Sequence, residues 1–316
     1  MKKAVLKTLI YADLFDYPLT AEELYRRLIG KRLLNNPFKD KFYFLPGRQK
    51  LLKLRREREL VTSRKMTRAK QLAGLLRLIP TVKLVGVTGS VAANNAKSED
   101  DIDFLIIAQS GCLWTTRFLV TLLLWPVKRK SKKTSVKDKN KICLNLFLDT
   151  DHLGIFAKQK DLFLAHEVLN LKLVWDRNDT YQKFLKANYW VKEFLPNCTP
   201  SPVILRSEAT KDLLELGFFS ASRRIRISKA CFEHKMTITA KFARMQNWIE
   251  KFFYHWQLAW MKGKRTDELV GPHLIAFHPG GLRQKVLKDY QEKLALFDIS
   301  SNSGQKKSSQ KGSQAN

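Results

Sequence analysis

Two aspartates near the middle of this 316-residue chain have the spacing of a metal site. Asp101 and Asp103 flank Ile102 at the start of an apolar run, so the two-residue period of a β-strand places both carboxylates on one face. Two neighbouring carboxylates repel each other unless a cation lies between them, and Mg2+ takes oxygen ligands from carboxylates and substrate phosphates. The pair therefore predicts a site for a hard divalent cation.

Gly89 and Ser90 supply the second half of the expected site. They follow an apolar strand predicted over 82–87, and ten residues separate Ser90 from Asp101. Gly89 permits a tight turn at the strand end, after which backbone amides and the Ser90 hydroxyl can hold phosphate oxygens. The two halves together predict a site for a metal-bound phosphate.

The Gly89-Ser90 turn, the ten-residue gap and the DxDF strand resemble the signature of the DNA polymerase beta-like nucleotidyltransferases, over about residues 67–194. The resemblance implies that Asp101 and Asp103 are catalytic and ligate two ions, Mg2+ or Mn2+. It also implies that Gly89 and Ser90 bind the phosphates of a nucleoside triphosphate (NTP). A hydroxyl acceptor would then receive the nucleoside monophosphate. The wider layout resembles uncharacterised prokaryotic nucleotidyltransferase-domain proteins.

The family has a third carboxylate on a later strand, and here this chain departs from the pattern. The strand predicted over 142–148 carries Asn145 at its middle. Asp149 shares the face of Asn145 but lies roughly 13 Å further along the strand, at about 3.3 Å per residue. Glu99 would approach the metals only if its loop folds inward. The departure leaves open a catalytically degenerate protein that binds nucleotide or nucleic acid.

The elements around these residues predict an α+β fold, with a small mixed nucleotidyltransferase-like sheet and flanking helices. Beyond the 82–87 strand we expect strands over 102–108 and 142–148 and helices over 113–124, 161–174 and 181–194. The expected domains are a winged-helix-like domain (1–66), a nucleotidyltransferase domain (67–195), a helical domain (196–299) and a disordered basic tail (300–316).

The winged-helix prediction rests on the pattern of the first 66 residues. Thr20 can cap a helix with Glu23 closing a capping box, and 41–45 is β-prone. A basic helix follows, and then Leu60-Val61-Thr62 as a second short strand. In the helical domain, Trp248, Phe252, Trp256 and Trp260 stand four residues apart and share one helix face, which is more typical of a packing seam than of a platform for bases.

Charge is the most unusual property of the composition. Lys and Arg number 58 against 29 Asp and Glu, a formal net charge of +29 that favours a polyanionic partner. The basic segments 47–70 and 127–141 make nucleic acid a possible partner beside the NTP. The apolar stretch 113–127 is too short to span a bilayer and reads as a core helix, with a membrane-surface role as the alternative.

The remaining signals are weaker. Four separated cysteines without CxxC spacing favour reduced thiols and a cytoplasmic location. His273 and His278 have no third ligand nearby in the sequence, so a turn is expected there rather than a metal site. An AMP-transferring partner in a toxin and antitoxin pair is a further possibility by analogy. The nucleotide, the acceptor and the oligomeric state are not determined by these patterns.

Overall fold

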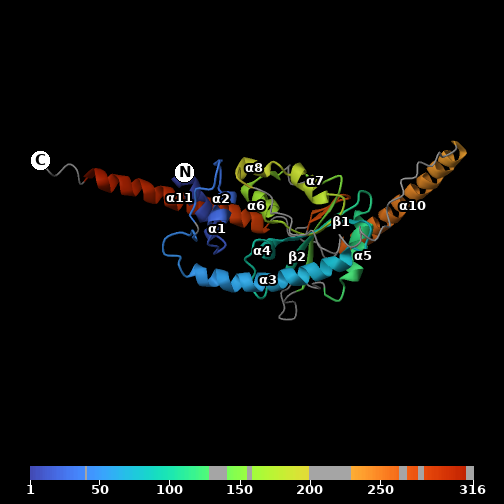
Figure 1. The fold of residues 1–316 in the computed structure, drawn as a ribbon, viewed down its shortest axis with the longest axis horizontal. Coiled ribbons are helices and arrows are strands. Elements are labelled where there is room, and N and C mark those ends of the chain that lie inside the picture. The colour runs from blue at the N-terminus through green and yellow to red at the C-terminus, as the bar shows by residue number, and fades with distance from the viewer. Residues whose placement is uncertain are drawn as a thin grey trace.

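A single mixed sheet lies at the centre of the computed structural model, with helices on both faces (Figure 1). This arrangement confirms the predicted α+β class. The structure describes residues 1–39, 41–127, 141–154, 159–198, 229–262, 269–276 and 281–310, with side chains in all of these except 229–244 and 298–310. Across the six-stranded sheet the order is β4 (Lys172–Asp176), β1 (Val82–Thr88), β2 (Ile102–Ala108), β3 (Ile142–Asp149), β6 (Leu274–Ala276) and β5 (Leu269–Val270).

The directions of the strands bring the predicted site residues to one end of the sheet. β1 runs antiparallel to β2 and β4, whereas β2 and β3 are parallel. β1 therefore stops where β2, β3 and β4 begin. We call this the acidic end of the sheet, and it includes Thr88, Asp103 and Lys172. The distal end includes Ala108, which pairs with Asp149.

Alternation of side chains along the strands builds one hydrophobic cluster on each face. Val85, Val87 and Phe104 belong to one cluster, whereas Leu84 and Leu105 belong to the other. In Figure 1, α3 runs along one side of the sheet and α6 to α8 lie on the other. The first cluster includes residues of α3 (Leu51–Leu76), α4 (Gly89–Ala92), α5 (Leu113–Leu123) and α10 (Lys229–Lys262), and the second includes residues of α1 (Lys2–Asp13), α6 (Leu162–Asn170), α7 (Thr180–Ala187), α8 (Val191–Phe194) and α11 (Gly281–Gln310).

The N-terminal region differs from the expected winged helix. The capping box of Thr20 and Glu23 forms at the start of α2 (Ala21–Arg26), as predicted. The second strand of the wing does not form, because Leu60-Val61-Thr62 lies inside α3. The apolar and β-branched residues there occur at helical spacing within a long run of good helix formers. Among residues 1–39 and 41–66 the only β-pairing is an isolated bridge between Leu19 and Tyr43.

Three basic residues of α3, namely Arg55, Arg58 and Lys65, are buried and contact the protein itself rather than solvent. The guanidinium of Arg55 pairs with Glu23 and Glu59, at 2.7 Å in each case. Arg58 donates to the Phe15 carbonyl and the Asn95 side chain. These contacts hold the side chains of Arg55 and Arg58 inside the protein, away from solvent.

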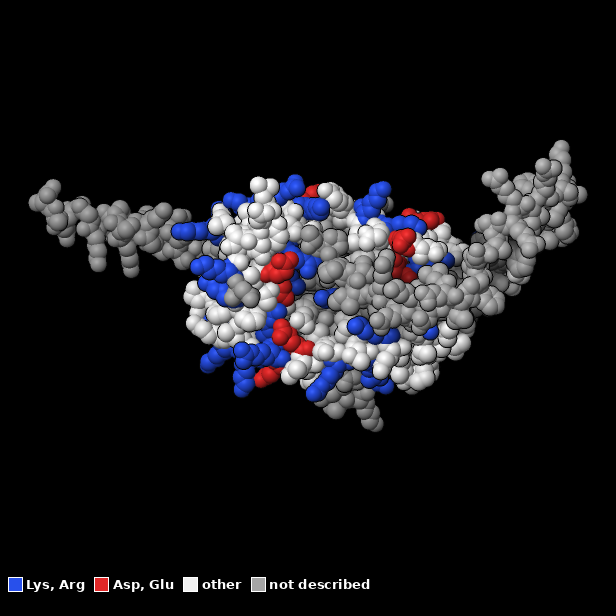
Figure 2. All heavy atoms as spheres, in the orientation of Figure 1, with Lys and Arg blue, Asp and Glu red and all other residues white. Residues whose placement is uncertain are grey.

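The arginines near the start of α3 also differ in how far they reach solvent. Arg48 pairs with Asp13 and Asp16, and of the four arginines at 48, 55, 56 and 58 only Arg56 and Arg48 reach solvent substantially. Figure 2 shows basic side chains spread over this face, with acidic ones between them. Most of the second basic segment, 127–141, lies outside the described residues. On α3 itself Lys53, Arg56, Arg64 and Lys70 are exposed, so part of the predicted basic surface is present there.

The C-terminal region is not purely helical as predicted for 196–299. β6 pairs antiparallel with β3, and β5 with β6, so both extend the central sheet. α10 packs against α5, and the Glu250 carboxylate accepts hydrogen bonds from the backbone N–H groups of Trp114 and Thr115. These bonds cap the start of α5, so the region is joined to the sheet rather than separate from it.

The aromatic stripe on α10 is exposed. Trp248 is 69% exposed and Trp256 49%. The seam against α5 is instead formed by neighbouring positions, where Phe253 stacks on Phe118 and Gln257 donates to the Trp114 carbonyl. The stripe is thus largely exposed rather than a buried seam, because the helix is rotated to turn the next residues inward, although Trp256 still makes an edge contact with Phe118 of α5 at 5.7 Å.

Several predicted elements have different boundaries in the structure. The helix predicted over 161–174 stops at Asn170, and the chain then enters β4, because edge pairing with β1 outweighs helix propensity. α11 continues to Gln310, so part of the predicted disordered tail is helical, and 311–316 lie outside the described residues. Among the described helices, including α5, we find none with the length and apolarity needed to cross a bilayer.

Candidate functional site

The turn after β1 has the backbone shape expected of a glycine. Gly89 has φ of +67°, in the left-handed region that disfavours other residues, and it opens the single turn of α4 that contains Ser90. Thr88, the last residue of β1, pairs with Asp103 on β2. The antiparallel pairing of β1 and β2 therefore places the turn after Thr88 beside Asp103.

Gly89 and Asp103 are in contact. A Cβ added to Gly89 would lie 2.5 Å from Oδ2 of Asp103. The predicted phosphate turn and the predicted acidic strand thus meet at the acidic end of the sheet. Any side chain on residue 89 would have to displace the Asp103 carboxylate.

Asp101 and Asp103 share one face of the sheet. Asp101 is the residue before β2, and Ile102 and Phe104 on either side of Asp103 belong to the cluster beneath α3 and α4. Alternation turns the two aspartates to the opposite face, that of Leu105. Both are partly exposed, which leaves them open to a substrate.

Glu167 is the acidic residue that the sequence interpretation missed. It lies on α6, whose start is capped by the Asp161 side chain, and its carboxylate is near the backbone N–H of Gly89. Burial raises the pKa of Glu167 to about 7 and the charge of Asp103 adds to this, whereas the Gly89 N–H opposes it. A glutamate on an otherwise apolar helix was the available signal, since such residues are seldom buried without a partner.

The two residues considered for the third carboxylate are now located. Asn145 is the extra residue of a bulge in β3, between the partners of Phe104 and Leu105, and its buried Oδ1 has no hydrogen-bond partner among the described residues. Asp149 lies at the distal end, six residues beyond the Cys143 that pairs with Asp103, or about 20 Å along the strand. Asp149 is therefore too distant to join Asp101 and Asp103.

Glu99 is exposed and accepts a hydrogen bond from the neighbouring Ser98 hydroxyl. Its loop is held by Lys65, whose ammonium donates to the backbone carbonyls of Ser98 and Asp100. The loop therefore has an anchored shape, and Glu99 is turned to solvent in it.

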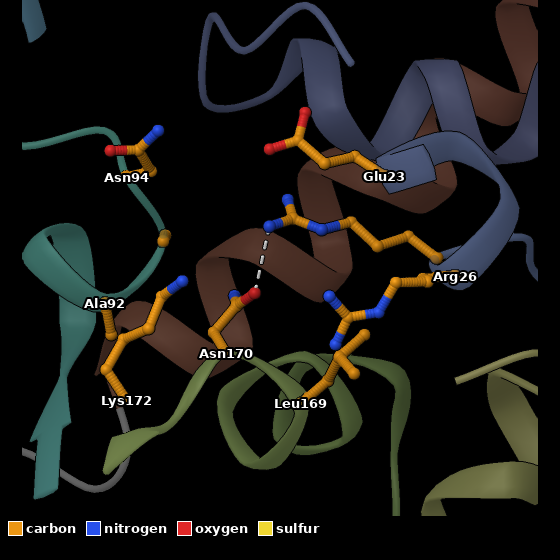
Figure 3. A pocket seen from close by; sticks show the side chains of 9 residues that line it. Glu23, Arg26, Ala92, Asn94, Leu169, Asn170 and Lys172 are labelled. Carbon is orange, nitrogen blue, oxygen red and sulfur yellow. Dashed lines mark hydrogen bonds between the residues drawn. The ribbon is translucent and has the colours of Figure 1, made fainter. Parts of the chain in front are cut away.

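A small cationic pocket lies beside this site (Figure 3). It has a volume of about 100 Å³, enough for a phosphate-sized group but not for a whole nucleotide. Lys172 at the start of β4 pairs with Val87 and enters the pocket with Arg26 and Arg27. Burial lowers the pKa of Lys172, and the positive charges of Arg27 and Arg26 lower it further. The pocket adds positive potential at the acidic end.

His166, next to Glu167, gives a pH-dependent prediction about stability. Its ring stacks on Tyr11 at 4.1 Å and its Nδ1 lies 2.9 Å from the Leu162 carbonyl. Burial lowers the pKa of His166 from 6.5 to about 3; the Leu162 carbonyl opposes this shift and Arg27 adds to it. Between these values the unfolded chain binds a proton that the folded protein does not. The free energy of unfolding due to His166 therefore falls by about 1.4 kcal/mol per pH unit as the pH drops below about 6.5.

Urea unfolding of the wild type and of His166→Gln at pH 7.5 and pH 5.0 checks this expectation. Glu167, whose pKa is raised, acts in the opposite direction over this range, so the difference between the two proteins is the informative quantity. Relative to the variant, the wild type should lose about 2 kcal/mol between the two pH values. An unchanged difference would contradict the buried, neutral state of His166.

The comparisons with known proteins supply no family. No family model matches the chain, and no curated protein does. A crystal structure of a toxin-antitoxin with AMP-PNP is similar over 39% of this chain and 86% of that chain, with 14% sequence identity and a TM-score of 0.23. A similarity at this level carries no argument about function, which must come from the site.

Proposed function

We propose that the protein is a metal-dependent nucleotidyltransferase that moves a nucleoside monophosphate from an NTP to a hydroxyl acceptor. One observation carries the proposal: the Asp103 carboxylate lies against Gly89, 2.5 Å from where a Cβ would be. A phosphate turn and a pair of acids are useful to this chemistry only when they are neighbours in space. The contact meets that requirement.

The residues present fit a divalent cation. Glu167 is close enough to Asp103 for the two negative charges to interact, and Asp101 shares the face of Asp103. Carboxylate oxygens are the ligands that Mg2+ and Mn2+ prefer. When bound, such ions lower the pKa of the attacking hydroxyl and neutralise charge on the departing pyrophosphate.

The roles of binding metal and phosphate would be divided among the side chains of this site. Asp101 and Asp103 would hold the ions, and Glu167 would add negative charge to the same cluster. Since the Glu167 carboxylate is near the Gly89 N–H, the phosphates would rely on Ser90 and the positive charge around Lys172. This division assigns Gly89 mainly a spacing role, because its missing side chain makes room for Asp103.

Transfer is tested with the full chain and four α-labelled NTPs, in Mg2+ and in Mn2+, against pools of RNA, protein and small hydroxyl compounds. Covalent transfer of label with release of pyrophosphate is the expected result. Absence of both products with every NTP and pool would overturn the proposal.

A nucleotide-binding protein without catalysis is the second candidate. It is favoured by Asn145, which stands where the resemblance implies a third carboxylate. Binding of a labelled NTP that depends on Mn2+, without transfer or pyrophosphate release, would identify it. Nucleic-acid binding through α3 is a weaker part of this candidate, because Arg55 and Arg58 are buried in internal contacts.

Glu167→Gln tests the newly located acid. Glutamine retains the size of the side chain and can still accept from Gly89, but it removes the charge. We expect the affinity for Mn2+, measured by electron paramagnetic resonance, to fall roughly 10- to 100-fold, the range for residues that support a metal site. Glu193→Gln is the matched control, because Glu193 pairs with Lys160 on the surface. Equal Mn2+ affinity of the two variants would show that Glu167 does not contribute to the metal site.

A further inference from the structure

Three ligand-type side chains meet at the distal end of the sheet. Asp149 ends β3, His152 lies three residues later, and His273 lies just before β6. Oδ1 of Asp149 is 2.8 Å from Nδ1 of His152, and Oδ2 is 2.6 Å from Nδ1 of His273. Ligand atoms of all three lie within 4.8 Å of one another.

The shape of this cluster suits a metal ion. The Asp149 side chain is 1% exposed, whereas those of His152 and His273 are 42% and 48% exposed. The two rings are stacked, with centroids 3.9 Å apart and planes 17° from parallel. Both stacked rings turn their Nδ1 atoms toward the same Asp149 carboxylate. A buried carboxylate beside them supplies the negative charge that a divalent cation requires.

The distances between the ligand atoms can be compared with those around a bound zinc ion. Zinc lies about 2.0–2.2 Å from imidazole nitrogen and carboxylate oxygen in a tetrahedral arrangement, so its ligand atoms are separated by about 3.4 Å. The distances of 2.8 Å and 2.6 Å to the Asp149 oxygens would therefore have to widen by about 0.6–0.8 Å. Both histidines are partly exposed and outside regular strands, so small shifts of these rings suffice.

We propose that Asp149, His152 and His273 form a binding site for a divalent transition metal of the zinc type. Nitrogen ligands favour Zn2+, Co2+ or Ni2+ over Mg2+, which prefers oxygen. The site is separate from the acidic end, since Asp149 is about 20 Å along the sheet from the level of Asp103. Three protein ligands leave room for water to complete the coordination.

An ion bound at this site would link the β5–β6 hairpin to β3. His273 lies in the turn between β5 and β6, and β6 contributes only three pairs to β3. Asp149 and His152 belong to the β3 side of that contact. A shared ion would therefore join two segments more than 100 residues apart, independently of any nucleotide chemistry.

Co2+ titration of the metal-free full chain provides the test. The wild type should develop the visible absorption of nitrogen-coordinated Co2+, and Zn2+ should abolish that absorption by replacing the Co2+. His152→Ala and His273→Ala should each weaken binding at least roughly 100-fold, since even supporting residues of metal sites contribute 10- to 100-fold. His255→Ala, which changes an exposed histidine of α10, should bind as the wild type does.

Two further measurements make the outcome unambiguous. Zn2+ should slow amide exchange of Leu274–Ala276 in the wild type and in Asp103→Asn, which separates this site from the proposed nucleotidyltransferase site. His273→Gln, a gentler change, should lose the effect while its circular dichroism matches the wild type. Failure of the wild type to bind Co2+, or equal binding by wild type and both histidine variants, would overturn the proposal.

Discussion

Asp103→Asn should reduce nucleotidyl transfer by about 1,000-fold while leaving the fold intact. A metal ion contributes several kcal/mol of charge stabilisation in the transition state, and each 1.36 kcal/mol corresponds to tenfold in rate. The amide keeps the size of the side chain but binds a hard cation poorly. Asp101→Asn should have a similar effect, and the double variant should be little worse than either, because the two residues act on the same ions.

The measurement is kcat for label transfer, with circular dichroism to confirm the fold. Glu99→Gln is the matched control, because it removes one charge from the loop that leads into β2 while Glu99 itself is exposed. Its rate should remain within about twofold of the wild type, as expected for a screened surface charge. Loss of activity in Glu99→Gln, or retention in Asp103→Asn, would contradict the assignment of the acids.

Gly89→Ala should impair activity far more than stability. Its Cβ would meet Asp103 Oδ2 at 2.5 Å and force the carboxylate away from the turn. A misplacement of about 1 Å in a catalytic group can cost on the order of 100-fold in rate. The positive φ adds a conformational cost of about 1–2 kcal/mol, which thermal unfolding would register.

Gly111→Ala separates these two effects. Gly111 also has φ of +67°, but the nearest atom to its added Cβ, Nε2 of Gln246, is 3.9 Å away. Both variants should lose similar stability, because the backbone strain is the same. Only Gly89→Ala should lose kcat/KM for transfer. If the two variants lost activity equally, strain rather than contact with Asp103 would explain the effect.

The central strands and the β1–α4 turn could be predicted from the sequence because they depend on local residue patterns. The strand predicted over 102–108 matches β2, because an unbroken apolar run after a DxD start suits a strand covered on both faces. Thr20 and Glu23 likewise form the expected capping box, since its hydrogen bonds are made within three residues. These features depend on near neighbours.

Elements that depend on distant partners were predicted less well. Leu60-Val61-Thr62 has β-prone residues but lies within α3, where flanking residues favour a continuous helix. The first three residues of β4, 172–174, were expected to be helical, and they form a strand because β1 offers an unpaired edge. Trp248 and its companions were placed in a seam, yet the contact with α5 selects the adjacent face of α10.

By itself the sequence determined that Asp101 and Asp103 share a strand face and that Gly89 can make the turn before them, because strand period and glycine conformation are local properties. The tertiary structure decided that the turn touches Asp103, that Glu167 rather than Asp149 approaches it, and that Asp149 instead meets His152 and His273. Strand order and helix packing bring residues together across long separations, and no local pattern encodes the distances between them.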